Sequence, residues 1–203
     1  MVTQQHKFIL VVVVGSLILG CRKEEVKPIP KIQGKKVVMI IASKNFRDEE
    51  LETPRSILKT QGAKVTIASS SLDTAIGMRG TKITPDILIT DVNVADYDAI
   101  IFVGGVGASE YWNDSTAHKI AKKAVEQNKL LCAICIAPVT LANAGVLTGK
   151  KVTAWSSEKD KLELKGATYT GVNVQIDGKI ITANGPAAAK EFGETIVKAL
   201  AAK

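Results

Sequence analysis

The chain has 203 residues and a formal net charge of +7, with 46% hydrophobic, 23% charged and 4% aromatic residues. This length supports one domain with its own core, and the composition excludes collagen-like and disordered chains. The charge is concentrated near the N-terminus, because residues 22–36 carry six Lys/Arg and two Glu. From Val37 onward the net charge is only +2 and no basic cluster with interleaved aromatics occurs. Nucleic acid is therefore not an expected partner.

The first twenty residues are typical of a bacterial lipoprotein signal peptide. A 12-residue apolar run, Phe8 to Leu19, follows His6 and Lys7 and is shorter than the ~20 residues of a membrane-spanning helix. It ends in LILGC, in which Gly20 resembles the residue before the cleavage site and Cys21 the cysteine that receives the lipid.

We therefore expect a signal peptide over 1–20, a basic tether over 21–35 and a domain over 36–203. Lipid at Cys21 predicts attachment to the cell envelope, on its periplasmic or extracellular face. The alternatives are an uncleaved membrane anchor and, after it, a cytosolic chain. The tether either lies against anionic headgroups or is a solvated linker with no specific partner.

Downstream of the tether, short apolar runs alternate with amphipathic stretches, the pattern of parallel strands joined by crossover helices. We expect strands over 36–42, 64–70, 99–103, 129–134 and 151–155, a hairpin of 172–176 with 180–183, and short strands around a turn at 79–80. We expect helices over 46–62, 115–128, 137–144, 157–165 and 187–201. Ser115 is interpreted as the cap of the second helix. Pro54 should kink the first helix or mark its true start, and Pro85 should confine its strand to a sheet edge.

Two cysteines lie three residues apart in LLCAICIAP, residues 130–138. Cys132 falls inside the predicted strand, where three residues of rise separate the pair by roughly 10 Å. That spacing exceeds the ~7 Å reach of a disulfide. No second cysteine pair or histidine cluster completes a zinc site, so we expect no metal and no cofactor. Cys132 is interpreted as a small core residue.

Cys135 falls where a buried strand passes into a helix, so we expect its thiol at the carboxyl end of the sheet, where ligands bind in open α/β folds. Free backbone N–H groups there would stabilise a thiolate. Gly104 and Gly105 end another strand, and their N–H groups could complete an oxyanion-type pocket with that of Ile136. The alternative for Cys135 is an inert buried cysteine. Among the carboxylates of residues 48–53, one turned inward could share a proton with the thiol.

These segments resemble the ThiJ/PfpI superfamily, which includes the Parkinson-associated protein deglycase. The similarity rests on EELET (49–53), IIFVGGVGA (100–108), AICIAP (133–138) and the segment that begins with DGKIITANGP (177–186). It implies a flavodoxin-like three-layer α/β sandwich, with a mostly parallel sheet and helices on both faces, usually a homodimer.

The same resemblance implies roles for individual residues. Cys135 matches the reactive cysteine, and Glu52 matches the glutamate that hydrogen-bonds its sulfur, lowers its pKa and stabilises a sulfinate. Gly105 and Ile136 match the oxyanion-hole positions. We expect Trp155 and Pro186 to line the pocket.

One departure from the family concerns the general base. Trp155 and Ile136 occupy the two places where catalytic members carry a histidine, and the chain's histidines are His6 and His118. The latter is interpreted as a surface residue of a helix. Without an imidazole to accept the thiol proton, peptidase or amidase activity is disfavoured.

Three hypotheses remain. The first is an enzyme of the glyoxalase or deglycase type acting on small reactive aldehydes through Cys135 and Glu52. The second is a redox or protective protein whose cysteine meets peroxide. The third is a chaperone-like scaffold in which the cysteine is dispensable.

Overall fold

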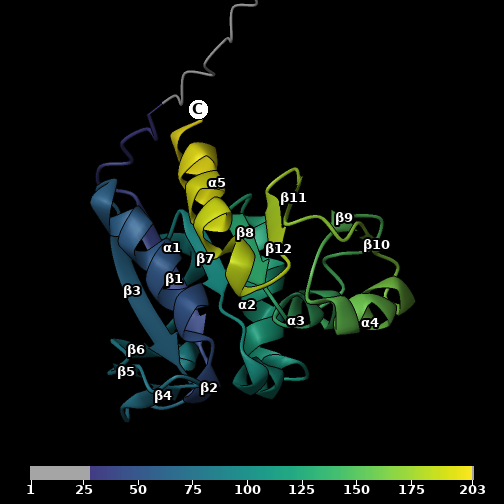
Figure 1. Ribbon diagram of the computed structural model, residues 1–203, viewed down its shortest axis with the longest axis horizontal. Helices are drawn as coiled ribbons and strands as arrows, with labels where there is room; N and C mark the ends of the chain where they lie inside the picture. Colours follow the sequence, from purple (N-terminus) through teal and green to yellow (C-terminus); the bar gives the residue numbers. More distant parts are fainter. Residues whose placement is uncertain (1–27, 203) are drawn as a thin grey trace, which may run out of the picture.

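The structure, a computed structural model, describes residues 28–202, and its centre is a seven-stranded sheet (Figure 1). The strand order is β11-β12-β8-β7-β1-β3-β6. The bounds are β1 Lys36–Ile41, β3 Lys64–Ser69, β6 Ile87–Leu88, β7 Ala99–Phe102, β8 Leu130–Ile134, β11 Val174–Asp177 and β12 Ile180–Ala183. Neighbouring strands are parallel except β11, which pairs antiparallel with β12. The edge position of β6 agrees with the expectation from Pro85.

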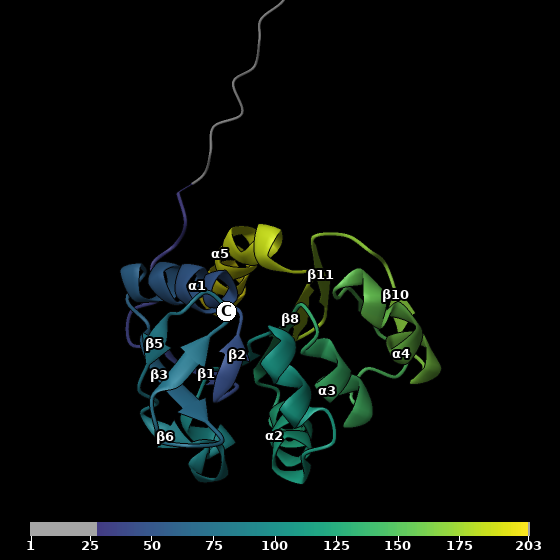
Figure 2. The same cartoon turned by 60° about the horizontal axis from the view of Figure 1, so that its bottom comes forward.

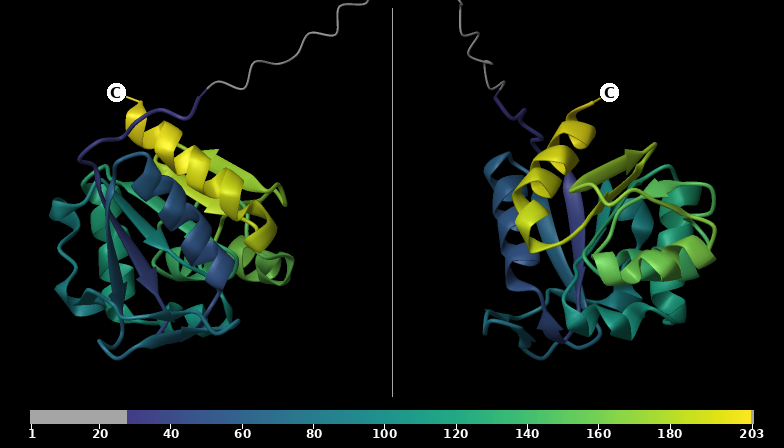
Figure 3. Two further views of the ribbon diagram at one scale, coloured as in Figure 1. Left: turned by 60° about the vertical axis from the view of Figure 1, so that its left-hand side comes forward. Right: turned by 45° about the vertical axis from the view of Figure 1, so that its right-hand side comes forward.

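Helices cover both faces of this sheet. On one face α1 (Asp48–Thr60) and α5 (Ala189–Ala201) lie side by side, as the left view of Figure 3 shows. On the other face lie α2 (Ser115–Glu126), α3 (Pro138–Asn143) and α4 (Lys159–Leu164), and Figure 2 shows α2 and α3 opposite α1 and α5. The predicted three-layer α/β sandwich is therefore confirmed.

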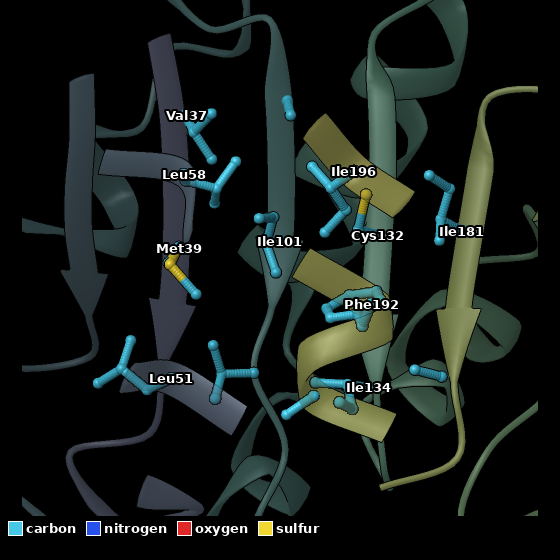
Figure 4. Packing of buried hydrophobic residues seen from close by; sticks show 14 of the residues in the cluster. Val37, Met39, Leu51, Leu58, Ile101, Cys132, Ile134, Ile181, Phe192 and Ile196 are labelled. Carbon is cyan, nitrogen blue, oxygen red and sulfur yellow. The ribbon is translucent and has the colours of Figure 1, made fainter. Parts of the chain in front are cut away.

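Alternation along β1 supplies both hydrophobic cores, since successive side chains of a strand point to opposite faces. Val37 and Met39 pack toward α1 and α5, whereas Val38 and Ile40 belong to the second core. Figure 4 shows the first core, with Met39 among aliphatic side chains from the strands and the two helices. Because both faces are covered, the central strands are apolar almost without interruption.

Smaller elements surround the sheet. Two minor sheets are formed by β2 (Lys44–Phe46), β4 (Ala75–Gly77) and β5 (Lys82–Ile83), and by β9 (Lys151–Val152) with β10 (Thr168–Tyr169). Short 3-10 turns occupy Ile89–Asp91, Val94–Asp96, Val106–Tyr111, Ser156–Glu158 and Pro186–Ala188. Neither β2 nor β10 is predicted from the sequence, because strands of two or three residues carry too little alternation to detect.

Three local predictions are wrong in detail. Asp114, not Ser115, caps α2, and its side chain accepts a hydrogen bond from the Ala117 N–H. The first helix starts at Asp48 and runs through Pro54 to Thr60, so the proline does not mark its start, and the alternative of a kink at Pro54 stays a prediction. Pro54 lies on the buried face of α1, where Gly193 lets α5 approach closely. The strand expected over 151–155 is reduced to β9, Lys151–Val152.

The expected signal peptide and Cys21 lie outside the described residues, and so do residues 22–27 of the tether. The described part of the tether, residues 28–35, packs on the domain at its C-terminal end. Ile32 is buried in the core beneath α1, and its N–H donates to the carbonyl of Gln61. Over residues 28–202, every helix is too short or too polar to cross a membrane.

Candidate active site

Cys135 occupies a strained turn between β8 and α3. Its backbone is left-handed, with φ at 64°, which costs a non-glycine residue roughly 1–2 kcal/mol. Two backbone hydrogen bonds of 2.9 Å hold it there, from its own N–H to the carbonyl of Ala183 and from the Trp155 N–H to its carbonyl. The turn places the thiol at the carboxyl end of the sheet, as predicted.

The thiol borders an open hollow of about 190 Å³. Cys135 is 9% exposed, so its sulfur is largely covered but still reaches this space. The hollow is lined by Arg47, Glu50, Met78, Gly105, Val106, Cys135, Ile136, Trp155 and Pro186. Besides Cys135, its ionisable lining residues are Arg47 and Glu50. The structure thus brings together the predicted residues Cys135, Gly105, Ile136, Trp155 and Pro186.

Glu50, rather than Glu52, is the carboxylic acid beside the thiol. Glu50 is fully buried, and the Cys135 thiol acts on its pKa as a hydrogen-bond partner. Glu52 is exposed and borders a different surface depression, with Arg55 and Lys59. The prediction of Glu52 is therefore corrected to Glu50. The two side chains lie about 200° apart around α1, because each residue advances a helix by about 100°.

Helical periodicity is the signal that identifies Glu50. Glu50, Pro54 and Leu58 are spaced by four residues, share one face of α1 and are all buried. The motif EELET contains three glutamates, Glu49, Glu50 and Glu52, for a single family position. Only the apolar face of the helix decides between them.

Two glycines allow Glu50 to approach the sulfur. A Cβ atom on Gly104 would collide with the Glu50 carboxylate and would lie 2.5 Å from the Cys135 Cβ. A Cβ on Gly105, where φ is 95°, would collide with the backbone N of Arg47. The two glycines thus let the start of α1 press against the end of β7. This contact is fixed by a hydrogen bond of 2.9 Å from the Arg47 N–H to the Gly104 carbonyl.

Backbone N–H groups lie close enough to the sulfur and its acid partner to affect their titration. Those of Gly105 and Ile136 act to lower the pKa of the Cys135 thiol, and that of Gly104 acts to lower the pKa of the Glu50 carboxyl. These N–H groups could stabilise an oxygen anion formed next to the sulfur.

The protonation state of the pair differs from the expectation of a lowered thiol pKa. Burial raises the pKa of Glu50 to about 8, so its carboxyl is protonated at neutral pH. Burial and the Glu50 charge raise the pKa of Cys135 to about 12, against the opposing effect of the N–H groups of Gly105 and Ile136. Protonation of Glu50 removes the unfavourable charge next to the sulfur. The free site therefore holds a neutral thiol beside a neutral acid.

Neither carboxyl oxygen of Glu50 has a hydrogen-bond partner of good geometry within residues 28–202. The carboxyl is nevertheless close enough to the thiol and to the Gly104 N–H for both to influence its pKa. A buried acid of this kind is costly for stability, and sites that combine burial with a specific partner are typical of function.

The remaining predicted residues are placed as follows. Cys132 is fully buried in the core beneath α5, as Figure 4 shows, and burial raises its pKa, which agrees with a structural role. Trp155 is 47% exposed and its ring lies against Gly185. The His118 ring forms a hydrogen bond of 2.9 Å with the Trp112 carbonyl and does not line the hollow. Within residues 28–202, His, Cys, Asp and Glu form no cluster of three that could hold a metal ion.

Comparisons with known proteins show what this chain is similar to. Residues 35–199 match the model of the DJ-1/PfpI family. An uncharacterized protein of Methanocaldococcus jannaschii is 44% identical over 168 residues, covering 81% of this chain and 82% of that protein. A protein named a deglycase, from Pyrococcus horikoshii, is 31% identical over 163 residues, covering 80% of this chain and 98% of the relative.

Two further comparisons agree with this. A protein of Caenorhabditis elegans named a glutathione-independent glyoxalase is 30% identical over 166 residues, covering 82% of this chain and 89% of that protein. The crystal structure of a ThiJ/PfpI domain protein from Brachyspira murdochii superposes with a TM-score of 0.81 at 30% identity, covering 83% of this chain and 97% of that one.

Proposed function

This chain belongs to the DJ-1/PfpI family, and on that premise we propose that it is a cysteine-dependent enzyme acting on small reactive aldehydes of the glyoxal type. The observation that carries the proposal is the pairing of the Cys135 thiol with the buried Glu50 carboxyl at an open hollow. The relatives named as a deglycase and a glyoxalase support this substrate class.

The first chemical step is addition of the thiol to the aldehyde carbon. The new bond joins the Cys135 sulfur to that carbon, the C=O π bond breaks, and the thiol proton ends on the oxygen. Glu50 relays this proton, taking it on one carboxyl oxygen while giving its own from the other. The N–H groups of Gly105 and Ile136 stabilise the oxygen as its negative charge develops. The product is a hemithioacetal.

Turnover of glyoxal then requires rearrangement and hydrolysis. A base removes the hydrogen from the hemithioacetal carbon, and a proton returns to the neighbouring carbon, which converts the adduct to a thioester. Water cleaves the thioester to a hydroxy acid and restores the thiol. With a pKa of about 8, a minor fraction of Glu50 is ionised near neutral pH, and this form is the base that removes the hydrogen. Once protonated, the same carboxyl can return the proton to the neighbouring carbon.

The missing imidazole limits the rate. Neither Trp155 nor Ile136 can accept the thiol proton, and the raised pKa of Cys135 leaves few molecules as thiolate. We expect turnover slower than that of a family member with a histidine at the position of Trp155.

Glyoxal turnover by variants tests the proposal. Cys135→Ser should abolish turnover, and Glu50→Gln should lower kcat by about 10²-fold, because an amide cannot relay the proton. Glu52→Gln is the matched control, two residues away on the exposed side of α1, and should keep wild-type turnover. Turnover that survives Cys135→Ser would refute the enzyme.

A second candidate function is oxidation of Cys135 by peroxide, favoured by the hydrogen-bond donors around the sulfur. A sulfinate oxygen could accept from the N–H groups of Gly105 and Ile136 and from protonated Glu50. Intact mass after mild peroxide provides the test: a gain of two oxygens in the wild type, but not in Cys135→Ser, without glyoxal turnover, would favour this function. If the wild type shows neither glyoxal turnover nor this oxidation, the scaffold hypothesis remains.

Lipid attachment at Cys21 in the cell envelope also remains a proposal, supported by the LILGC sequence. Metabolic labelling with a radioactive fatty acid should mark the wild type and not Cys21→Ala.

Homodimer formation, proposed from the family resemblance, is tested by sedimentation velocity. A single species with the mass of one chain at micromolar concentration would contradict it.

A further inference from the structure

Arg47 lies at the N-terminal end of α1 and is, among residues 28–202, the only cationic residue that lines the hollow beside Cys135. Its backbone is fixed against the end of β7 by the hydrogen bond to Gly104, so its position relative to the thiol is set by the same glycine contact that places Glu50. Its side chain is 22% exposed, so it is shielded from bulk water but reaches the hollow.

Part of the Arg47 guanidinium is already occupied. Its Nε donates to Glu49 at 2.8 Å and its Nη2 donates to the other carboxyl oxygen of Glu49 at 3.3 Å. A guanidinium has five N–H donors, and within residues 28–202 no other side-chain hydrogen bond of Arg47 is formed. Three N–H groups are therefore free for a ligand.

Charge at this edge of the hollow favours an anion. Glu49 also pairs with Arg79 at 2.9 Å, so two guanidinium groups share one carboxylate. Glu50 is neutral at neutral pH. The Asp48 carboxylate accepts from the N–H groups of Arg79 and Thr81 and does not line the hollow.

We infer that Arg47 is a specificity-determining residue that receives a carboxylate, and that the site prefers aldehydes with a carboxylate one or two carbons from the carbonyl. The inference rests on the proposed function, because it assumes that the substrate meets Cys135 in this hollow. The arginine fork matches the two oxygens of a carboxylate. The remaining lining is apolar, from Met78, Val106, Ile136, Trp155 and Pro186, which suits a short carbon skeleton.

Alkylation of Cys135 tests this without turnover. Iodoacetate and iodoacetamide have nearly the same shape and place either a carboxylate or a neutral amide next to the reacting carbon. In both reactions the sulfur–carbon bond forms, iodide leaves and the thiol proton passes to solvent. The ratio of the two rates cancels the reactivity of the thiol and reports recognition of the carboxylate. Peptide mass mapping assigns each rate to Cys135.

In the wild type we expect a ratio of iodoacetate to iodoacetamide rates at least about fivefold above that of free cysteine, the size of one partly screened charge-assisted hydrogen bond. Arg47→Gln should return the ratio to the free-cysteine value, and Arg47→Lys should retain part of the gain because it keeps the charge. Arg79→Gln is the matched control, since it removes the same charge from the same carboxylate at a residue outside the hollow. Its ratio should change less than twofold.

A ratio unchanged in Arg47→Gln would overturn the inference and leave Arg47 as a structural partner of Glu49. Equal losses in the Arg47 and Arg79 variants would also overturn it, since they would indicate general surface charge. The inference would also be overturned if Cys135 reacted with neither reagent, because the hollow would then not admit a two-carbon acid. Failure of the proposed enzyme appears instead as absent glyoxal turnover in the wild type, which leaves the alkylation ratio free to be measured.

Discussion

Replacing the buried acid Glu50 by glutamine should remove the loss of stability that the wild type shows as pH rises from acidic to neutral and alkaline values. The folded state keeps a proton on Glu50 up to a pKa of about 8, whereas the ordinary value for glutamate is 4.5. Between these two pH values the native state binds more protons than the unfolded state, so the free energy of unfolding falls as pH rises. The loss is complete only above about pH 8.

The size of the effect follows from proton linkage. The wild type should lose up to about 1.4 kcal/mol per pH unit in this window, on the order of 3 kcal/mol by pH 7 and 4 kcal/mol by pH 8. The raised pKa of Cys135 does not contribute to this slope, because the thiol of the unfolded chain is still protonated in this window and ionises only near its ordinary pKa of about 8.5. Glu50→Gln has no ionisable group there and should lack this slope.

Urea unfolding at pH 5, 6, 7 and 8 measures the difference. The comparison is the slope of the unfolding free energy against pH, since any fixed cost of placing an amide beside the sulfur cancels. Glu52→Gln should follow the wild-type slope within error, because that side chain is exposed. Parallel pH curves for the wild type and Glu50→Gln would show that Glu50 ionises normally, and the proposed protonated acid would be refuted.

Three further outcomes follow from the packing. Gly104→Ala places a methyl group against the Glu50 carboxylate and should destabilise the fold by roughly 2–3 kcal/mol, measured by urea unfolding; an unaffected midpoint would contradict the close contact. Asp114→Ala should cost about 1 kcal/mol through the lost helix cap, whereas Ser115→Ala should leave the thermal midpoint nearly unchanged. Cys132→Ala should cost about 1 kcal/mol in unfolding free energy and preserve glyoxal turnover; lost turnover in a folded variant would give this cysteine a catalytic role.

The position of the reactive thiol could be predicted from local sequence alone. The chain can turn only between the end of the buried strand at Ile134 and the start of the next helix at Pro138. Cys135 is the residue with a reactive side chain in that turn. Its left-handed backbone could not be predicted, because strain at a non-glycine residue depends on the hydrogen bonds to Ala183 and Trp155.

The acid partner shows the limit of motif reasoning. The motif EELET contains three glutamates, and matching the letters to the family motif favours Glu52, which is the wrong one. Counting the apolar face of the helix would have favoured Glu50, in line with Pro54 and Leu58. Periodicity is reliable here because burial of one helix face is a strong energetic constraint, whereas the identity of a charged residue in the first turn is a weak one.

The sequence by itself determined the succession of parallel strands and crossover helices, the strands that carry the core, the turn at Cys135 and the absence of histidine at positions 136 and 155. These follow from alternation, helical period and residue type, which are local properties of the chain. Only the tertiary structure decided which acid meets the thiol, that burial raises rather than lowers the thiol pKa, and that Arg47 shares the hollow. Each of these depends on contact between three segments that lie about 30 to 90 residues apart in sequence: α1, the end of β7 and the turn after β8. Two glycines allow them to meet. Electrostatic effects between such segments depend on distance and burial in space, which the order of residues along the chain does not specify.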